Sequence, residues 1–445
     1  MASSEKKARS SGRSGSSREK RKPPQHPTFV GKSRSVYNFE RLNVIGQGTY
    51  GVVYRARDKE TQAIVALKKL RMEREKEGMP LTSLREIRLL KACHHPNVVQ
   101  LQDIVVGNKL DSIFLVFEYC ENDLATLLDT AMKRKFTEGE VKCLLRQLLS
   151  ATAYMHDHWM IHRDIKMSNL LYNNRGELKL ADFGLAREFS ECGSSGVIGG
   201  GGQASKGTGG GAREEAAAFA MTPKVVTLWY RAPELLLGEA AYGLSIDLWS
   251  VGCIFGELLQ RTPLLPGSSV VEQLERIQAL LGAASERIWP GLAVLPLARK
   301  FAFDGNRFRY NNLARRFSEI SPVHGVGLLD ALLTYDPARR ITAAAAARHP
   351  YFEEKPLPAE PTMMPTFPSL HTQPGYRGRH QPLGDAAKGK GTAAAAAVPT
   401  VAAAAKSRGR SGAVLSAAWA SDDQRFGSAF GSGGGGGGGK RARHF

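Results

Sequence analysis

The stretch His162–Gly184 (HRDIKMSNLLYNNRGELKLADFG) constrains this chain more than any other part of its sequence. Its apolar residues alternate on both sides of the segment Asn173–Gly176, which predicts two short antiparallel strands joined by a turn. A hairpin of this kind would bring Asn169 and Asp182 to the same end. Amide and carboxylate oxygens suit a hard divalent cation. We therefore predict a Mg2+ site at Asn169 and Asp182.

Two further groups in this stretch suit the transfer of a phosphoryl group. Asp164 is placed to accept a proton from an attacking hydroxyl. Lys166 adds positive charge where a phosphoryl group in transit would build up negative charge. The order and spacing of these residues are similar to the catalytic template of protein kinases.

A glycine-rich segment, Gly46-Gln47-Gly48-Thr49-Tyr50-Gly51, precedes this stretch. Glycine lets a backbone close over phosphates because it has no Cβ. The motif alone would also fit a tight hairpin. It joins two expected strands rather than a strand and a helix, which argues against a dinucleotide-binding unit. The expected strands in this region are Leu42–Ile45, Gly51–Arg57 and Ile64–Leu70.

A lysine and a glutamate are expected to meet beside the glycine-rich segment. Lys68 follows Val65-Ala66-Leu67 in a strand, so we predict that it grips the α- and β-phosphates of ATP. Pro80–Glu86 (PLTSLRE) should begin a helix running through Lys91, capped by Thr82 or Ser83. Glu86 would then reach Lys68. The alternative is that Glu86 is only an acidic residue in the first turn, where the helix dipole favours negative charge.

The segment Pro80–Glu86 resembles the helix that names the PISSLRE and PITSLRE cyclin-dependent protein kinases. The resemblance covers roughly residues 32–368, is strongest to the PISSLRE branch, and fails in both tails and in one insertion. It implies an α+β, bilobal protein-kinase fold, with a small, mainly β lobe carrying one regulatory helix and a larger, mainly α lobe. Further matching stretches are Lys32–Val36, Tyr119-Cys120, Asp123-Leu124-Ala125, Met221–Lys224, Glu354–Pro358 and Met364–Pro368.

The resemblance also implies an ATP site. Phe117 would gate the adenine pocket, the backbone of Glu118 and Cys120 would meet the adenine edge, and Asp123 would hold the ribose. The free regulatory helix would swing outward until a cyclin binds it. The full expected nucleotide-binding set is Ile45, Gly46, Gly48, Gly51, Val53, Ala66, Lys68, Phe117, Glu118, Cys120, Asp123, Asn169 and Asp182.

The activation segment, Asp182–Glu234, carries a Gly-, Ser- and Ala-rich insert at about residues 190–220, which exceeds the usual length in this family. By resemblance, Thr222 is the activating phosphothreonine, modified by another kinase. Its phosphate would draw together three arginines, although these could also be unrelated surface residues. Thr49 and Tyr50 are expected inhibitory phosphorylation sites. The three arginines are Arg85, Arg163 and Arg187.

Two structural pairings are also expected in the larger lobe. Asp247 should brace the backbone around His162–Arg163, and Arg340 should pair with Glu234. The resemblance further implies that the segment Val225–Arg231 forms a pocket favouring proline after the phosphorylated residue. Substrates would therefore be proteins with Ser-Pro or Thr-Pro sites.

The charge of the chain is concentrated at its ends. Its 445 residues carry a net charge of +19. Residues 1–36 hold ten Lys and Arg against two Glu, and residues 376–445 hold eleven against three Asp. Basic tails favour acidic partners or import machinery. Arg18–Lys22 is a candidate nuclear-import patch, and the equally weighted alternative is a tail that only increases solubility. We expect the nucleus, with the cytoplasm as an additional location.

Composition also bounds the class of protein. Five scattered cysteines match neither a zinc site nor a disulfide framework and suit a reducing compartment. The absence of a long apolar run or signal-peptide core predicts a soluble intracellular protein. The expected organisation is a disordered tail over 1–36, an N-lobe over 37–120, a C-lobe over 121–352, an extension over 353–375 packing on or near the kinase, and a disordered low-complexity tail over 376–445.

These observations favour a cyclin-dependent Ser/Thr kinase acting in cell-cycle or transcription regulation. The alternative is a pseudokinase scaffold whose basic tails bind RNA or chromatin. Every catalytic position is filled, which argues against the scaffold. The tails carry no RNA-recognition signature, so we expect no nucleic-acid partner.

Overall fold

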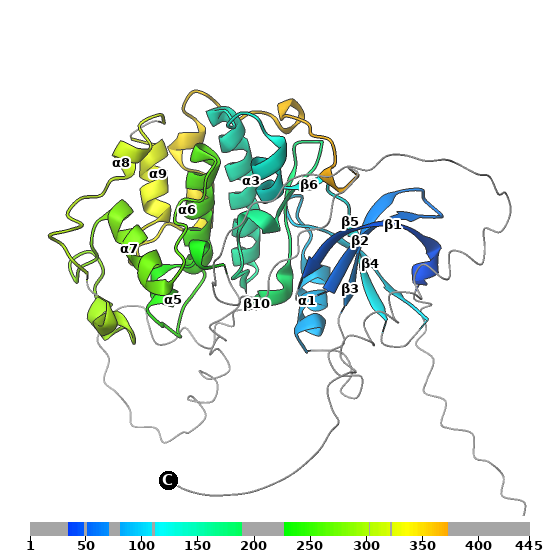
Figure 1. The fold of residues 1–445 in the computed structure, drawn as a ribbon, viewed down its shortest axis with the longest axis horizontal. Coiled ribbons are helices and arrows are strands. Elements are labelled where there is room, and N and C mark those ends of the chain that lie inside the picture. The colour runs from blue at the N-terminus through cyan, green and yellow to red at the C-terminus, as the bar shows by residue number, and fades with distance from the viewer. Residues whose placement is uncertain are drawn as a thin grey trace, which may run out of the picture.

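The structure is a computed structural model that describes residues 34–48, 51–70, 81–108, 112–188, 227–301, 303–320 and 323–372. Two lobes of unequal size lie side by side (Figure 1). The expectations for Thr49, Tyr50, Thr222, the insert at 190–220, and the tails over 1–33 and 376–445 lie outside the described residues.

The small lobe contains a five-stranded antiparallel sheet in the order β1-β2-β3-β5-β4. The three strands expected before the helix are present, and β1 is longer than expected because it pairs with β2 from Phe39 to Gly48. Val52, Tyr54 and Ala56 alternate along β2 and are buried in one apolar cluster. The strands are β1 Phe39–Gly48, β2 Gly51–Asp58, β3 Ile64–Leu70, β4 Leu101–Val106 and β5 Ile113–Glu118.

Helix α1, Leu81–Ala92, is the one α-helix described in this lobe. The expectation that Thr82 or Ser83 caps it is wrong, because the helix already includes both residues. Sequence signals for helix starts shift by one or two positions in this way, since several polar residues near a start compete as caps. The helix packs against the segments η4 (Phe183–Leu185) and β10 (Arg187–Glu188) of the large lobe.

The large lobe is built around two buried helices, α3 (Glu138–Asp157) and α6 (Ser245–Gln260). Thr137 and Glu140 form a reciprocal capping box at the start of α3, which satisfies two backbone amides there. The other helices are α2 Leu124–Thr126, α5 Pro233–Leu236, α7 Val270–Leu281, α8 Leu313–Arg316, α9 Gly325–Leu332 and α10 Ala343–Ala347. Among the described residues, this mainly helical lobe and the small sheet confirm the expected bilobal α+β fold.

Short strands between the lobes position the expected catalytic stretch. Strands β8 (Leu170–Tyr172) and β9 (Leu178–Leu180) pair antiparallel around the predicted turn, with β6 (Asn122–Asp123) beside β8. Strand β7, Met160–Ile161, pairs with β10. The hairpin predicted from the alternation of apolar residues is therefore confirmed.

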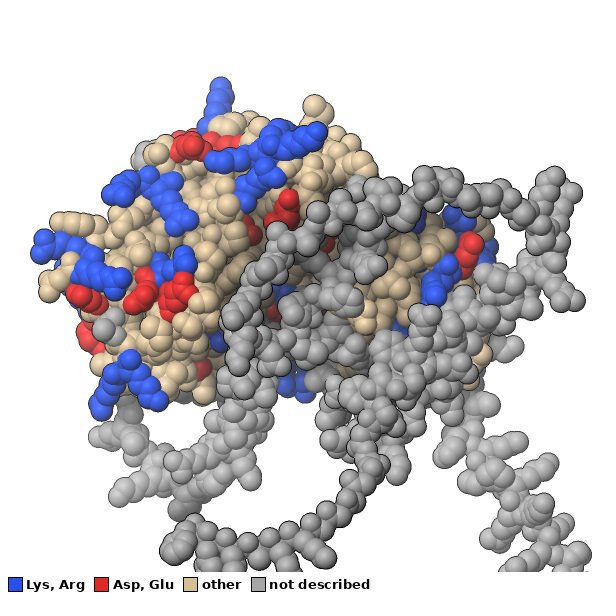
Figure 2. Space-filling view, in the orientation of Figure 1, with Lys and Arg blue, Asp and Glu red and all other residues tan. Residues whose placement is uncertain are grey.

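Charged side chains of both signs are interspersed over the visible face of the large lobe (Figure 2). Mixed charges of this kind make a solvated surface rather than a single charged field. Within the described part of the chain, no helix combines the length and apolar character needed to cross a bilayer.

Candidate active site

A buried aspartate, Asp247, holds the backbone at the start of the catalytic stretch. Asp247, near the start of α6, accepts hydrogen bonds from the backbone amides of His162 and Arg163, each at 2.9 Å. Arg163 adopts a left-handed conformation with φ 68°, which a non-glycine residue holds only when its surroundings fix it. The hydrogen bonds expected from Asp247 are present. They fix the backbone that leads to Asp164 and Lys166, in the region between the two lobes that is here called the cleft.

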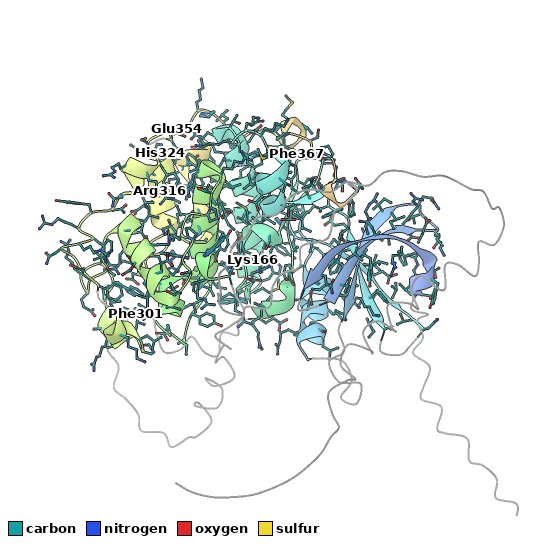
Figure 3. All side chains as sticks on the ribbon, in the orientation of Figure 1. Lys166, Phe301, Arg316, His324, Glu354 and Phe367 are labelled. Atoms are coloured by element: carbon teal, nitrogen blue, oxygen red, sulfur yellow. The ribbon has the colours of Figure 1, made fainter. Side chains whose placement is uncertain are left out.

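Asp164 lies at the centre of a small polar cluster. Its Oδ2 accepts hydrogen bonds from Lys166 Nζ at 2.8 Å and from Asn169 Nδ2 at 3.1 Å. Its Oδ1 is buried and accepts no hydrogen bond from the described residues. Burial raises the pKa of this carboxyl, and Lys166 opposes the rise. The orphaned oxygen fits a group that accepts a hydrogen bond from a substrate hydroxyl. Figure 3 shows Lys166 between the lobes.

Lys68, on β3, joins the two lobes through carboxylates. Its Nζ lies 2.6 Å from Glu86 Oε1 and 3.3 Å from Asp182 Oδ1. Burial by itself lowers the pKa of this ammonium, but Asp182 and Glu86 outweigh burial and raise it above its ordinary value. For Asp182 the directions are reversed. Burial alone would raise the pKa of its carboxyl, but the positive charges of Lys68 and Lys166 outweigh burial and lower the pKa below its usual range. The lysine is therefore held charged in the cleft.

The inward position of α1 differs from the expected outward swing of the free helix. The buried ion pair of Lys68 and Glu86 is closed, and α1 packs on segments of the large lobe. Breaking such a pair would strand a buried charge, which physically favours the closed arrangement.

The β8–β9 hairpin brings Asn169 and Asp182 to its open end. Leu170 pairs with Leu180, and Ala181 N donates to Asn169 O at 2.9 Å. The Asn169 side chain donates through Nδ2 to Asp164, which leaves Oδ1 as a potential ligand. No group of three His, Cys, Asp or Glu suited to a metal gathers in the described ranges. The amide and carboxylate oxygens fit a hard cation that completes its shell with phosphate and water oxygens.

The register of the small-lobe sheet brings the expected nucleotide residues together. Val53 pairs with Gly46 on β1 and with Lys68 on β3, and Ala66 pairs with Phe117 on β5. Ile45 lies in β1 beside Gly46, and Gly48 pairs with Gly51 where the glycine-rich hairpin turns. A Cβ on Gly51, at φ 146°, would lie 2.1 Å from Lys69 O, so this position requires glycine.

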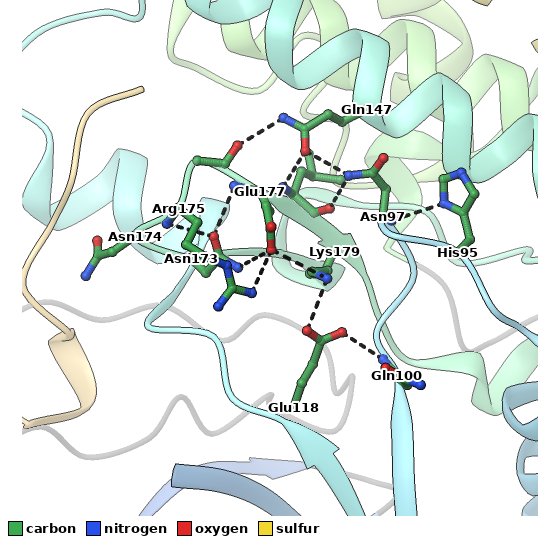
Figure 4. A network of polar contacts seen from close by, with 12 residues as sticks. His95, Asn97, Gln100, Glu118, Gln147, Asn173, Asn174, Arg175, Glu177 and Lys179 are labelled. Carbon is green, nitrogen blue, oxygen red and sulfur yellow. Dashed lines mark hydrogen bonds and ion pairs between the residues drawn. The ribbon is translucent and has the colours of Figure 1, made fainter. Parts of the chain in front are cut away.

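Side chains at the end of β5 and in the segment after it are held by polar contacts. The side chain of Glu118 points to Lys179 Nζ, 3.1 Å away, and accepts from Gln100 N (Figure 4). Cys120 is buried, and burial raises the pKa of its thiol. Asp123 caps α2 by accepting from Thr126 N at 2.8 Å, a role that the sequence interpretation missed. One of its carboxylate oxygens is thus already engaged.

The three predicted phosphate-binding arginines converge near the start of the activation segment. The pKa of the Arg187 guanidinium lies below its ordinary value, first because of burial and then because Arg85 and Arg163 are positive. Arg163 also donates to Leu185 O at 2.6 Å and to the hydroxyl of Tyr242 at 2.9 Å. Like charges gathered in this way suit an anion.

The sequence interpretation also missed the buried base Lys179. Its Nζ lies between Glu118 and Glu177, at 3.1 and 3.6 Å, and links β9 to the end of β5 (Figure 4). A lysine flanked by two leucines in a short strand was the available signal. It remained ambiguous because an exposed strand position gives the same pattern.

The sequence pattern of the protein kinase domain family matches residues 39–352, so the chain belongs to the protein kinases. Within them, it is similar to cyclin-dependent kinase 10 from human and from mouse, each 50% identical over 78% of this chain and 88% of the relative. It is also 48% identical to human cyclin-dependent kinase 11B, over 80% of this chain and 41% of that relative. The chain therefore belongs to the cyclin-dependent Ser/Thr protein kinases, which use ATP and a divalent metal. These comparisons give the pseudokinase scaffold no support.

Proposed function

We propose that this chain, bound to a cyclin, transfers the γ-phosphoryl group of ATP to serine or threonine followed by proline in protein substrates. The observation that carries the proposal is the convergence of two charged clusters on one cleft. The small lobe supplies Lys68 and Glu86. The large lobe supplies Asp164, Lys166 and Asp182, and Asp182 Oδ1 lies 3.3 Å from Lys68 Nζ. Such a convergence positions a nucleotide and a hydroxyl against each other.

Each cluster has a distinct task in this proposal. Lys68, fixed by Glu86, grips the α- and β-phosphates. Asn169 and Asp182 hold Mg2+, which supplies positive charge at the phosphate oxygens when bound. Asp164 orients the substrate hydroxyl and takes its proton, and Lys166 neutralises the phosphoryl group in transit. The adenine and ribose lie between Ile45, Val53, Ala66 and Phe117 and the backbone from Glu118 to Cys120, with Asp123 at the ribose.

The cyclin binds at the PLTSLRE helix in this proposal. On α1, Leu84 is 48% exposed although it is a large apolar residue, while Glu86 on the inner face is buried. An apolar side chain exposed on the regulatory helix fits a partner that holds the helix inward. Proline specificity is assigned to the segment Val225–Arg231, by resemblance.

Two phosphorylation events would regulate the site. An activating kinase modifies Thr222, and its phosphate bridges Arg85, Arg163 and Arg187. Phosphate on Thr49 or Tyr50 would lie beside the nucleotide phosphates and repel them. We further propose that the enzyme acts in the nucleus and also in the cytoplasm, in cell-cycle or transcription control, without binding membrane or nucleic acid directly.

The variant Asp164→Asn tests the proposal because it keeps the shape of the side chain and removes the proton acceptor. With a cyclin present, we expect transfer to a Ser-Pro peptide to fall by about 10³-fold or more, while ATP binding is retained. Transfer is followed with labelled ATP, and binding by calorimetry. Wild-type and variant proteins that are equally inert, although both fold and bind the cyclin, would overturn it.

A further inference from the structure

The chain after the kinase domain runs back over the surface, and the last residues described in this segment contact the small lobe. The segment from Glu353 to Thr372, here called the strap, follows the last part of the large lobe (Figure 1). Figure 3 shows Glu354 and Phe367 along the same edge of the large lobe, with Phe367 nearer the small lobe. The family match ends at residue 352, so the strap lies outside it.

The first half of the strap is fixed to the start of α3. Lys142, whose side chain is fully buried, donates to the carbonyls of Glu354 and Pro356 at 2.7 and 2.9 Å. Ala359 N donates to Gly139 O at 2.9 Å, and a Cβ on Gly139 would lie 2.9 Å from Leu357 O. Because this buried lysine donates its hydrogen bonds to backbone carbonyls of the strap, the path of the strap is part of the folded structure.

The middle of the strap crosses the β8–β9 hairpin. Gly176 has φ 74°, and a Cβ there would lie 1.9 Å from Pro361 O, so the close approach requires glycine. The hydroxyl of Tyr172 donates to Pro365 O at 2.6 Å, and Phe367 N donates to Asn174 Oδ1 at 2.9 Å. The strap is thus held to the same hairpin that carries Asn169 and Asp182 at its other end.

The last residues of the strap contact the segment between the lobes. Leu370 is buried, and its N–H donates to Oδ1 of the buried Asn122 at 3.0 Å. The hydroxyl of Tyr119 lies 2.7 Å from Ser369 Oγ and 3.3 Å from His371 Nδ1. Tyr119 stands between Glu118 and Cys120, whose backbone is assigned to the adenine.

The strap then reaches the small lobe itself. Asn43 lies on β1, two residues before Ile45, and its Nδ2 donates to His371 O at 2.8 Å. Asp123 lies close enough to His371 to oppose the lowering of its pKa that burial causes. The strap therefore touches, within three consecutive residues, the inter-lobe segment and the strand that covers the nucleotide.

We propose that the strap positions the nucleotide site by tying β1 to the segment 118–123, with Ser369, Leu370 and His371 as its positioning residues. The inference rests on the proposed nucleotide site. The hydrogen bonds of residues 369–371 to β1 and to residues 118–123 restrict movement of these two segments relative to each other. The conformational entropy lost when ATP binds is therefore smaller. Loss of the strap contacts weakens ATP binding and leaves phosphoryl transfer from bound ATP largely unchanged.

The test compares two apolar-to-acid variants of the strap in the full chain with its cyclin. Leu370→Asp places a charge at the buried end, whereas Met363→Asp changes a side chain that is 78% exposed. We expect Leu370→Asp to raise the calorimetric Kd and the KM for ATP by about five- to tenfold, the size of one or two lost hydrogen bonds. The kcat and the peptide KM should stay within about twofold, and Met363→Asp should match wild type.

Amide hydrogen exchange gives a readout that does not depend on catalysis. Residues 113–123 should exchange faster in Leu370→Asp than in Met363→Asp. If Leu370→Asp fails to fold, the double variant Tyr119→Phe/Ser369→Ala decides, because it removes hydroxyl hydrogen bonds without burying a charge. Unchanged Kd for ATP and unchanged exchange in a folded variant overturn the strap inference. A wild-type protein that binds no ATP would instead overturn the proposed function.

Discussion

The cleft and the arginine cluster both gather charge, but they balance it differently. In the cleft, Lys68 faces Glu86 and Asp182, and Lys166 faces Asp164 at 2.8 Å. In the cluster, Arg85, Arg163 and Arg187 bring positive charges together, and their mutual repulsion lowers the pKa of Arg187 beyond the effect of burial.

The difference indicates which site is complete within the chain. Opposite charges in the cleft attract one another, so the fold itself holds these side chains in position. Like charges in the cluster raise the free energy of the assembled state, and a dianion between them would reverse this effect. This difference supports the proposal that the cleft carries the chemistry and that phosphorylation controls the cluster.

The largest effect is expected on stability, when one partner of a buried ion pair in the core of the large lobe is removed. Arg340 holds Glu234 with two hydrogen bonds, at 2.7 and 3.0 Å, and both side chains are buried. Arg340→Ala should lower the free energy of unfolding by about 3–5 kcal/mol, because Glu234 is left buried without a counter-charge. Urea unfolding measures this loss. The matched control is Arg307→Ala, whose ion pair with Glu275 has both side chains exposed, and it should cost less than about 1 kcal/mol.

A smaller effect is expected when the cleft loses one carboxylate. Glu86→Gln removes the charge that lies 2.6 Å from Lys68 and keeps Asp182, which lies 3.3 Å from Lys68. We expect kcat/KM to fall by about 10²-fold, because the lysine is no longer fixed toward the phosphates. Steady-state kinetics with cyclin present measures it. Arg88→Gln, on the exposed side of α1, should change the rate little; an equal loss there would point to damage of the helix rather than of the ion pair.

The arginine cluster gives the next effect. Thr222→Ala should lower activity more than about tenfold in the cyclin-bound enzyme, because no phosphate then bridges the arginines. Arg187→Ala should have a smaller added effect in the Thr222→Ala background than in the phosphorylated wild type, since both changes remove the same interaction. Unchanged turnover of Thr222→Ala would contradict the role of the cluster.

A final effect depends on pH and concerns a buried acid that has no cationic partner among the described residues. Glu257 accepts a hydrogen bond from the hydroxyl of Tyr230 at 2.6 Å, and burial raises its pKa from 4.5 to about 7. A raised folded-state pKa means that stability is lost as pH rises from about 4.5 to about 7. Glu257→Gln does not titrate at this position, so it should be more stable than wild type by about 3 kcal/mol at pH 8 and gain little at pH 5, since one pKa unit corresponds to about 1.4 kcal/mol.

Thermal unfolding across this pH range measures the effect. The control is Glu275→Gln, which makes the same substitution at an exposed position of the large lobe and should follow wild type across this pH range. A constant difference between Glu257→Gln and wild type would show that the carboxyl is not the titrating group.

Much of the fold followed from local pattern. Alternation around Asn173–Gly176 predicted the hairpin at β8 and β9, and the strand Ile64–Leu70 has the bounds that the sequence indicated. The helix that begins within Pro80–Glu86 was also expected to run through Lys91, and α1 ends one residue later, at Ala92. These features depend on contacts between residues close in sequence, so the sequence contains their cause.

Candidate residues came from motifs, whereas their partners came from packing. The residue types at Lys68, Glu86, Asp164 and Asp182 stand out in the sequence. The buried Lys179, the capping role of Asp123 and the inward position of α1 do not, because each depends on which distant side chain lies opposite.

The sequence by itself determined the class of enzyme and the short-range elements that carry its reactive groups. Only the tertiary structure decided how the strap reaches from residue 353 to Asn43, and how the three arginines meet. Contacts between residues far apart in the chain depend on the summed burial of the whole core, and no local pattern encodes that sum.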